Sequence, residues 1–251
     1  MERVSSTLRP CIGTLNLASV SRLLLILLLL SSLRLTVPSP ITLLLNLSPG
    51  SVSEQFNMPA SHFKTFKEAV QASALMVSTL FIVEFADLVL QQTRHNTLAG
   101  YGIVPRTVPG LVGIAFSPLL HASPAHLLAN ALPLFVLLVL LFWDRHYYPV
   151  VTLASIWFFS GLGTWLIGRG SDAGRPIVHI GASAIIFGLV TYLIVAGFIM
   201  KSWRSAIVAL LVLIGFGGIF YGVMPHAGPI SWEGHLSGAL AGVWAAKRNH
   251  E

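Results

Sequence analysis

The sequence predicts an all-α protein, a polytopic bundle of six transmembrane helices, from three observations. Hydrophobic residues make up 55% of the 251 residues and charged residues only 10%, whereas a soluble domain carries about 25% charged residues. Long apolar runs recur, and a helix needs about 20 mostly apolar residues to cross a bilayer. The alternating pattern of a membrane β-barrel is absent from the sequence. We therefore expect the lipid bilayer to cover most of the surface.

The same composition excludes several functions. So few charges exclude a soluble enzyme. The formal net charge is +6, but Lys and Arg are scattered through short loops and form no basic stripe, so we expect no nucleic-acid partner. The single cysteine, Cys11, cannot form an internal disulfide, and the sequence has no zinc-binding spacing of His and Cys. The sequence therefore implies neither a metal nor an organic cofactor.

Residues 1–57 differ in composition from the rest of the chain. Ser, Arg and Pro surround a Leu-rich run at 23–33 that is too short to span a bilayer comfortably. We interpret residues 1–57 as an N-terminal extension of uncertain status. It is an extra hydrophobic segment, a signal-like segment, or sequence upstream of an alternative start at Met58.

Residues 58–251 form the expected six-helix domain. Helices are the natural choice for each apolar run, because backbone groups in lipid must be hydrogen-bonded within their own segment. The sixth run is short and the others approach the length of a full span. In chain order, the expected spans are 69–90, 125–142, 150–167, 180–200, 203–221 and 232–246.

Two carboxylates, Glu84 and Asp87, lie three residues apart on one face of the first span. Paired carboxylates in a membrane can form an ion or proton pathway. These two lie near the outer end of the helix, where they can reach water or pair with Arg106. We therefore favour a structural role.

The basic residues of the short loops orient the bundle. Cytoplasmic loops carry an excess of Lys and Arg. With the region before the first span inside, seven basic residues lie inside and four outside. This places both ends of the six-helix domain in the cytoplasm, and the even-numbered spans then begin at the outer side of the cell membrane. The inner set is Lys64, Lys67, Arg145, Lys201, Arg204, Lys247 and Arg248, and the outer set is Arg94, Arg106, Arg169 and Arg175.

Four polar residues occur where polar groups in a membrane are costly and commonly functional. His126 and Asn130 lie in the first turns of the second span, Ser183 near the start of the fourth, and His235 in the first turn of the sixth. All these spans begin outside, so the four residues fall within about 10 Å of the outer end. Three separate segments thus place polar groups at one depth.

These residue types suit nucleophilic catalysis. A serine hydroxyl needs a base to remove its proton, and His235 is the best candidate base for Ser183. Gly234, Gly238 and Gly242 recur every four residues on the helix of His235. Such small-residue faces let membrane helices pack closely. We therefore expect the fourth and sixth spans to bring Ser183 within hydrogen-bond reach of His235.

His126 and Asn130 are four residues apart and share a helix face. Together with the Ser183 backbone N–H they could donate hydrogen bonds to a developing oxyanion. Other interpretations remain: Ser183 as a helix-packing residue, His235 as a bridge between helices, and His126 and Asn130 as partners of a loop backbone. His179, at a loop edge, is expected to be solvated, as is His226.

Together these features resemble the rhomboid family of intramembrane serine proteases, over about residues 65–246. Each motif is weak alone, but their order and their positions on the spans make the set specific. The motifs are His121-x4-His126-x3-Asn130, Gly181-x-Ser183-x4-Gly188 and His235-x2-Gly238-x3-Gly242.

The resemblance implies a serine endopeptidase that cleaves transmembrane segments of membrane proteins. By this resemblance Ser183 is the nucleophile and His235 the base of a dyad without an acid. His126 and Asn130 match the oxyanion hole, His121 a histidine close to the site, and Phe187 an aromatic ring packed on the base. The glycines Gly181, Gly238 and Gly242 support the site. The fold implied is a six-helix bundle with a lateral substrate gate near the fifth span.

The sequence departs from the family pattern at two points. Ala184 follows the nucleophile where many members have glycine, and the first outer loop lacks a Trp-Arg pair found in some members. The rival interpretation is a catalytically inactive rhomboid-like protein that binds membrane proteins, or a small transporter. A transporter more naturally shows repeated broken helices, and no such repeat is evident. The sequence leaves the oligomeric state open.

Overall fold

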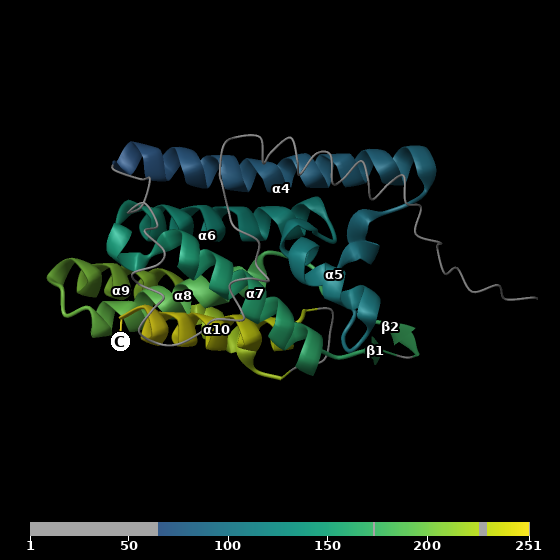
Figure 1. Cartoon of the computed structure of the whole chain (residues 1–251). Coiled ribbons are helices and arrows are strands. Elements are labelled where there is room, and N and C mark those ends of the chain that lie inside the picture. The colour runs from purple at the N-terminus through teal and green to yellow at the C-terminus, as the bar shows by residue number, and fades with distance from the viewer. Residues whose placement is uncertain (1–64, 173, 226–229, 251) are drawn as a thin grey trace, which may run out of the picture. The chain divides into compact units, whose positions relative to one another are not determined.

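A computed structural model describes residues 65–172, 174–225 and 230–250 of the chain (Figure 1). The described residues belong to the unit Met58–Glu251. The expected N-terminal extension, residues 1–57, lies outside them, as does His226.

The described part is all-α, as the sequence predicts. Its only strands are the two-residue β1 (Ser171–Asp172) and β2 (Arg175–Pro176), which pair antiparallel. Short 3-10 turns, η1 (Leu98–Tyr101), η2 (Ser117–Leu119), η3 (Arg145–Tyr147) and η4 (Gly217–Val223), join the helices. The helices are α4 (Phe66–Arg94), α5 (Val108–Phe116), α6 (Pro124–Trp143), α7 (Pro149–Ile167), α8 (Ser183–Ile199), α9 (Trp203–Phe216) and α10 (Trp232–His250).

Six of these helices correspond to the six expected spans, and α5 is additional. It lies in the loop between the first and second spans, where nine residues are too few for the search for long apolar runs to find. Thr107 caps its first turn by accepting a hydrogen bond from Gly110 N at 3.1 Å.

Within the described residues, four helical segments are long and apolar enough to cross a membrane: α4, α6, α7 together with η3, and α9 together with η4. Helix α8 is apolar but has 17 residues, and α10 ends with polar side chains. These two helices carry Ser183 and His235, and α10 packs against α7 and α8. Helix α8 contacts α6, α7, α9 and α10, whereas α4 packs mainly along α6 (Figure 1).

Glycines set the distance between α8 and α10. A Cβ atom added at Gly238 would collide with the carbonyl of Ala184, and one at Gly242 with the carbonyl of Gly188. The hydroxyl of Thr191 donates across the contact to the carbonyl of Ala239 at 2.9 Å. The expected close packing of the fourth and sixth spans is thus confirmed, because only glycine allows the two backbones to approach this closely.

Candidate active site

The close contact between α8 and α10 brings a serine and a histidine together at the N-terminal ends of both helices. Ser183 is the first residue of α8, and His235 lies in the first turn of α10. His235 Nε2 is 3.0 Å from Ser183 Oγ. His235 is 8% exposed. A hydroxyl within hydrogen-bond reach of an imidazole is the geometry that proton removal requires.

The second nitrogen of the His235 ring fixes the tautomer. His235 Nδ1 is 3.0 Å from the carbonyl oxygen of Gly222, in η4. A carbonyl only accepts, so Nδ1 carries the hydrogen and Nε2 presents its lone pair to the Ser183 hydroxyl. The ring of Phe187 stacks on the imidazole, with centroids 4.0 Å apart and planes within 11°. The carbonyl and the aromatic ring together hold the imidazole in one orientation.

The backbone at Gly181, two residues before Ser183, lies close to the ring of a second histidine, His126. Gly181 has a φ of 117°, a conformation that favours glycine. A Cβ added there would lie 3.0 Å from His126 Nε2 and 3.9 Å from Ser183 Oγ. The absence of a side chain at Gly181 therefore leaves a space that both groups face.

His126 can donate a hydrogen bond into that space. Its Nδ1 lies 3.4 Å from the backbone nitrogen of Ala122 and accepts from that N–H. The hydrogen of a neutral His126 ring then resides on Nε2. Ser123 places this histidine by capping α6, since its hydroxyl accepts from His126 N at 3.2 Å.

Asn130 takes a different position. Its side-chain amide donates to the carbonyl of His126 at 2.9 Å, one turn earlier on α6, and the side chain is buried. In this arrangement one N–H of the amide serves the helix backbone, and a hydrogen bond to a bound oxyanion would come from the second N–H of the same nitrogen.

His121 lies in the loop before α6 and supports His126. Its ring contacts the His126 ring edge-on, with centroids 5.1 Å apart. Burial, and to a lesser degree the charge of His126, lower the pKa of His121 to about 4, although the backbone of Leu119 acts in the opposite direction. His121 is therefore neutral near pH 7 and packs as an uncharged ring against His126.

Comparison with known proteins assigns the chain to a family. A model of the Rhomboid domain matches residues 109–249. The chain belongs to the rhomboid family. An uncharacterized protein of Mycobacterium tuberculosis (strain ATCC 25618 / H37Rv) is 45% identical over 174 residues, covering 68% of this chain and 70% of the relative. An uncharacterized protein of Mycobacterium leprae (strain TN) is 41% identical over 174 residues, with 68% and 67% covered. No solved structure matches.

Membership and helix content make the protein a multi-pass membrane protein with a rhomboid fold. The rhomboid-domain match includes Ser183, His235, His126 and Asn130, whose geometry is given above. Among the residues that the structure describes, no cluster of three or more His, Cys, Asp or Glu side chains could hold a metal ion.

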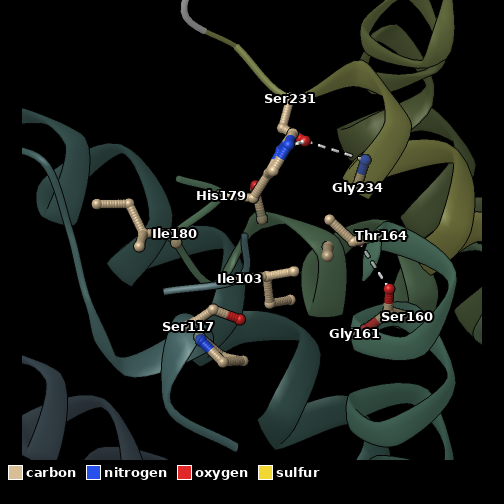
Figure 2. A pocket seen from close by; sticks show the side chains of 13 residues that line it. Ile103, Ser117, Ser160, Gly161, Thr164, His179, Ile180, Ser231 and Gly234 are labelled. Atoms are coloured by element: carbon tan, nitrogen blue, oxygen red, sulfur yellow. Dashed lines mark hydrogen bonds between the residues drawn. The ribbon is translucent and has the colours of Figure 1, made fainter. Parts of the chain in front are cut away.

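The sequence interpretation of His179 was wrong. This histidine is 5% exposed, and both ring nitrogens have partners, Ser231 Oγ at 2.6 Å and the carbonyl of Arg169 at 3.0 Å. It lines a cavity of about 30 Å³ beside Ser183 (Figure 2), room for about two water molecules. The sequence does mark Ser231, the partner of His179, as a candidate N-cap, because a serine stands just before the apolar run of α10. The partner across the loop could not be read from the sequence.

Gly222 was also missed, for a different reason. Its contribution is a backbone carbonyl, which no side-chain pattern marks. The glycine itself is required by space, since an added Cβ would lie 2.7 Å from Phe187 Cζ and 3.2 Å from His235 Nδ1.

Asp87 of α4 has a structural role, as favoured, but with partners other than Arg106. Asp87 accepts from the hydroxyl of Thr97 at 3.1 Å and from the backbone N–H of Leu98, and so holds the turn after α4. The suggested partner Arg106 instead donates to the carbonyls of Leu166 and Gly168, at 2.9 and 2.8 Å.

Proposed function

We propose that this rhomboid is an intramembrane serine endopeptidase that cleaves transmembrane segments of other membrane proteins. The observation that carries the proposal is the 3.0 Å contact between His235 Nε2 and Ser183 Oγ, with the opposite ring nitrogen bonded to the carbonyl of Gly222. This arrangement presents an unprotonated nitrogen to a serine hydroxyl without requiring an acidic third residue.

In the proposed reaction Ser183 Oγ attacks the carbonyl carbon of the scissile peptide while its proton passes to His235 Nε2. The imidazolium that forms keeps its Nδ1–H bonded to the Gly222 carbonyl. It then gives the Nε2 proton to the leaving amine, and the C–N bond breaks to leave an acyl ester on Ser183. Water, deprotonated by the same nitrogen, hydrolyses the ester and restores the serine.

Negative charge on the substrate oxygen needs donors in the space over Gly181. The Nε2–H of His126, the backbone N–H of Ser183 and the second N–H of the Asn130 amide are the proposed donors. Losing one such donor typically costs about 10²–10³-fold in rate.

The proposed substrates are transmembrane proteins whose helix is destabilised near the outer leaflet. A helix hides its peptide bonds, so a substrate segment must unwind before Ser183 can reach a carbonyl. The excess of basic residues in the inner loops supports a site on the outer side of the cell membrane.

Labelling with a fluorophosphonate, which reacts with activated serines, tests this proposal. The full-length protein in detergent micelles should be labelled, and both Ser183→Ala and His235→Ala should abolish the label. A folded wild-type sample that stays unlabelled, while an active rhomboid protease is labelled in parallel, would contradict the proposal and favour an inactive binding protein or a transporter.

A further inference from the structure

The loop between α7 and α8 contacts the turn that carries His235. His179, in this loop, points its ring at Ser231, just before α10 (Figure 2). Its Nε2 lies 3.0 Å from the carbonyl of Arg169, so Nε2 carries the hydrogen. Its Nδ1, 2.6 Å from Ser231 Oγ, therefore accepts a hydrogen bond from the serine hydroxyl.

Ser231 in turn holds the first turn of α10. With its proton directed at His179, its oxygen accepts a hydrogen bond from the backbone N–H of Gly234 at 3.1 Å. Its own carbonyl accepts from the backbone N–H of His235 at 3.2 Å. The hydrogen bonds thus run in one direction, from Gly234 through Ser231 and His179 to Arg169, and each group has the role that its chemistry permits.

A charged contact holds the same turn from the same loop. Arg169 donates from its backbone nitrogen, at 3.2 Å, and from its guanidinium to Oε1 of Glu233, which is 1% exposed. The guanidinium also donates to the carbonyl of Ile230 at 2.9 Å. Charge-assisted hydrogen bonds to a buried carboxylate are stronger than neutral ones. The residues immediately before His235 are therefore held twice.

The loop that holds this turn also leads to Ser183. His179 pairs through its backbone with Ile103, at 2.9 and 2.8 Å, and the chain then passes through Gly181 into α8. The nucleophile of α8 and the histidine of α10 are therefore positioned from one segment. Packing through Gly238 sets the spacing of the two helices, and the contacts of this loop hold the first turn of α10.

We propose that His179 and Ser231 are positioning residues, which fix the first turn of α10 and thereby the contact between His235 Nε2 and Ser183 Oγ. The inference rests on the proposed protease function. A displacement of about 1 Å at a catalytic group can cost about 10²-fold in rate, so loss of the contact slows the reaction of Ser183 even when the protein remains folded.

Burial favours the neutral His179 ring that this arrangement uses. Burial, the largest cause, lowers the pKa of His179, and the guanidinium groups of Arg169 and Arg106 act in the same direction. The Arg169 carbonyl and the carboxylate of Glu233 oppose them. At neutral pH the ring can therefore accept from Ser231 as described.

The test uses the full-length protein in detergent and measures the fluorophosphonate reaction of Ser183 as a maximal rate constant and a half-saturating probe concentration. Ser231→Ala should lower the rate constant by about 10- to 100-fold, with the half-saturating concentration unchanged. Ser231→Thr keeps the hydroxyl and should restore the rate constant. The matched control is Ser237→Ala, on the same helix, whose buried hydroxyl lacks a hydrogen-bond partner within the described structure.

The outcomes separate the two proposals. If wild type is labelled and Ser231→Ala reacts at the wild-type rate, Ser231 is not a positioning residue, although the protease function stands. If wild type is not labelled, the function itself fails. Should Ser231→Ala not fold, His179→Gln provides the second variant. A wild-type rate constant for folded His179→Gln would overturn the inference, and a decrease with the half-saturating concentration unchanged would support it.

Discussion

Helices α8 and α10 form two histidine–hydroxyl contacts, and the two contacts differ in the direction of the hydrogen bond. At the N-terminal ends of both helices Ser183 Oγ is 3.0 Å from His235 Nε2. Further along, Tyr192 Oη in the middle of α8 is 3.2 Å from Nε2 of His250, the last residue of α10. Tyr192 donates its proton to the carbonyl of Tyr147 at 2.6 Å, so its oxygen accepts from the histidine.

Under the proposed function, only an imidazole that accepts from the hydroxyl can remove its proton, so a histidine beside a hydroxyl is not by itself sufficient for activation. Near Ser183 the carbonyl of Gly222 occupies the far side of the imidazole and forces Nε2 to accept. Near Tyr192 the carbonyl of Tyr147 accepts the hydrogen bond that the hydroxyl donates, so the hydroxyl hydrogen does not point at His250. Space differs too, since Tyr192 is completely buried, whereas Gly181 leaves an opening beside Ser183.

The largest expected effect comes from replacing each of the two histidines by alanine and comparing the labelling rates of the two variants. His235→Ala should slow fluorophosphonate labelling by at least about 10³-fold, because the base is lost. His250→Ala, at the other end of the same helix, should leave labelling within about threefold of wild type, because distant sites act independently. Equal losses in the two variants would show that the helix contact as a whole, not the direction of one hydrogen bond, controls reactivity.

Acid should destabilise the folded protein through His121. The pKa of His121 is lowered to about 4 in the folded protein, while an unfolded histidine titrates near pH 6.5. The unfolded state therefore binds the proton first, and stability falls as the pH decreases from about 6.5 to 4, by about 3 kcal/mol in total.

Thermal unfolding in detergent across this pH range measures the effect of His121. His121→Gln should show a weaker decline than wild type, and the difference between the two proteins removes the contribution of the carboxylates that titrate in the same range. Parallel curves for the two proteins would contradict a neutral, buried His121.

A methyl group added at Gly222 should lower the labelling rate by about 10²-fold, the cost of a displacement of about 1 Å at a catalytic group. In Gly222→Ala the added methyl would lie 2.7 Å from Phe187 Cζ and would push on the ring stacked against His235. Gly218→Ala is the control on the same segment, because no atom lies within 4 Å of the added methyl. If both variants react at the wild-type rate, the orientation of His235 does not depend on this contact.

The smallest expected effect is on stability and concerns the contact between Gly238 on α10 and Ala184 on α8. Gly238→Ala places a methyl against the carbonyl of Ala184, and overpacking of this kind costs about 1–3 kcal/mol. Gly215→Ala, on α9, meets no atom within 4 Å and should leave the thermal midpoint unchanged. Equal midpoints in both variants would show that α8 and α10 can separate at little cost.

Much of this arrangement could be predicted from the sequence. Long apolar runs gave the six helices, because lipid requires a fully hydrogen-bonded helix for each. Polar residues at one depth, Ser183, His126 and His235, indicated where the helices converge. Glycines four residues apart indicated which helices pack closest.

The rest depends on tertiary contacts that sequence spacing does not contain. The partner of His235 Nδ1 is the backbone of Gly222, and the partner of His179 is a serine 52 positions later. The rotamer of Asn130 is similarly open in sequence, because an amide on a helix can donate to its own backbone or across a cavity. Helix α5 escaped because it is too short to resemble a membrane span.

The most direct test of the central claim is to locate the adduct after fluorophosphonate labelling of the full-length protein in lipid nanodiscs. Peptide mass spectrometry should find the phosphonyl group on Ser183 and none on Tyr192. Absence of an adduct on Ser183 in folded protein, with an active rhomboid protease modified under the same conditions, would contradict the claim that His235 and the Gly222 carbonyl activate this serine.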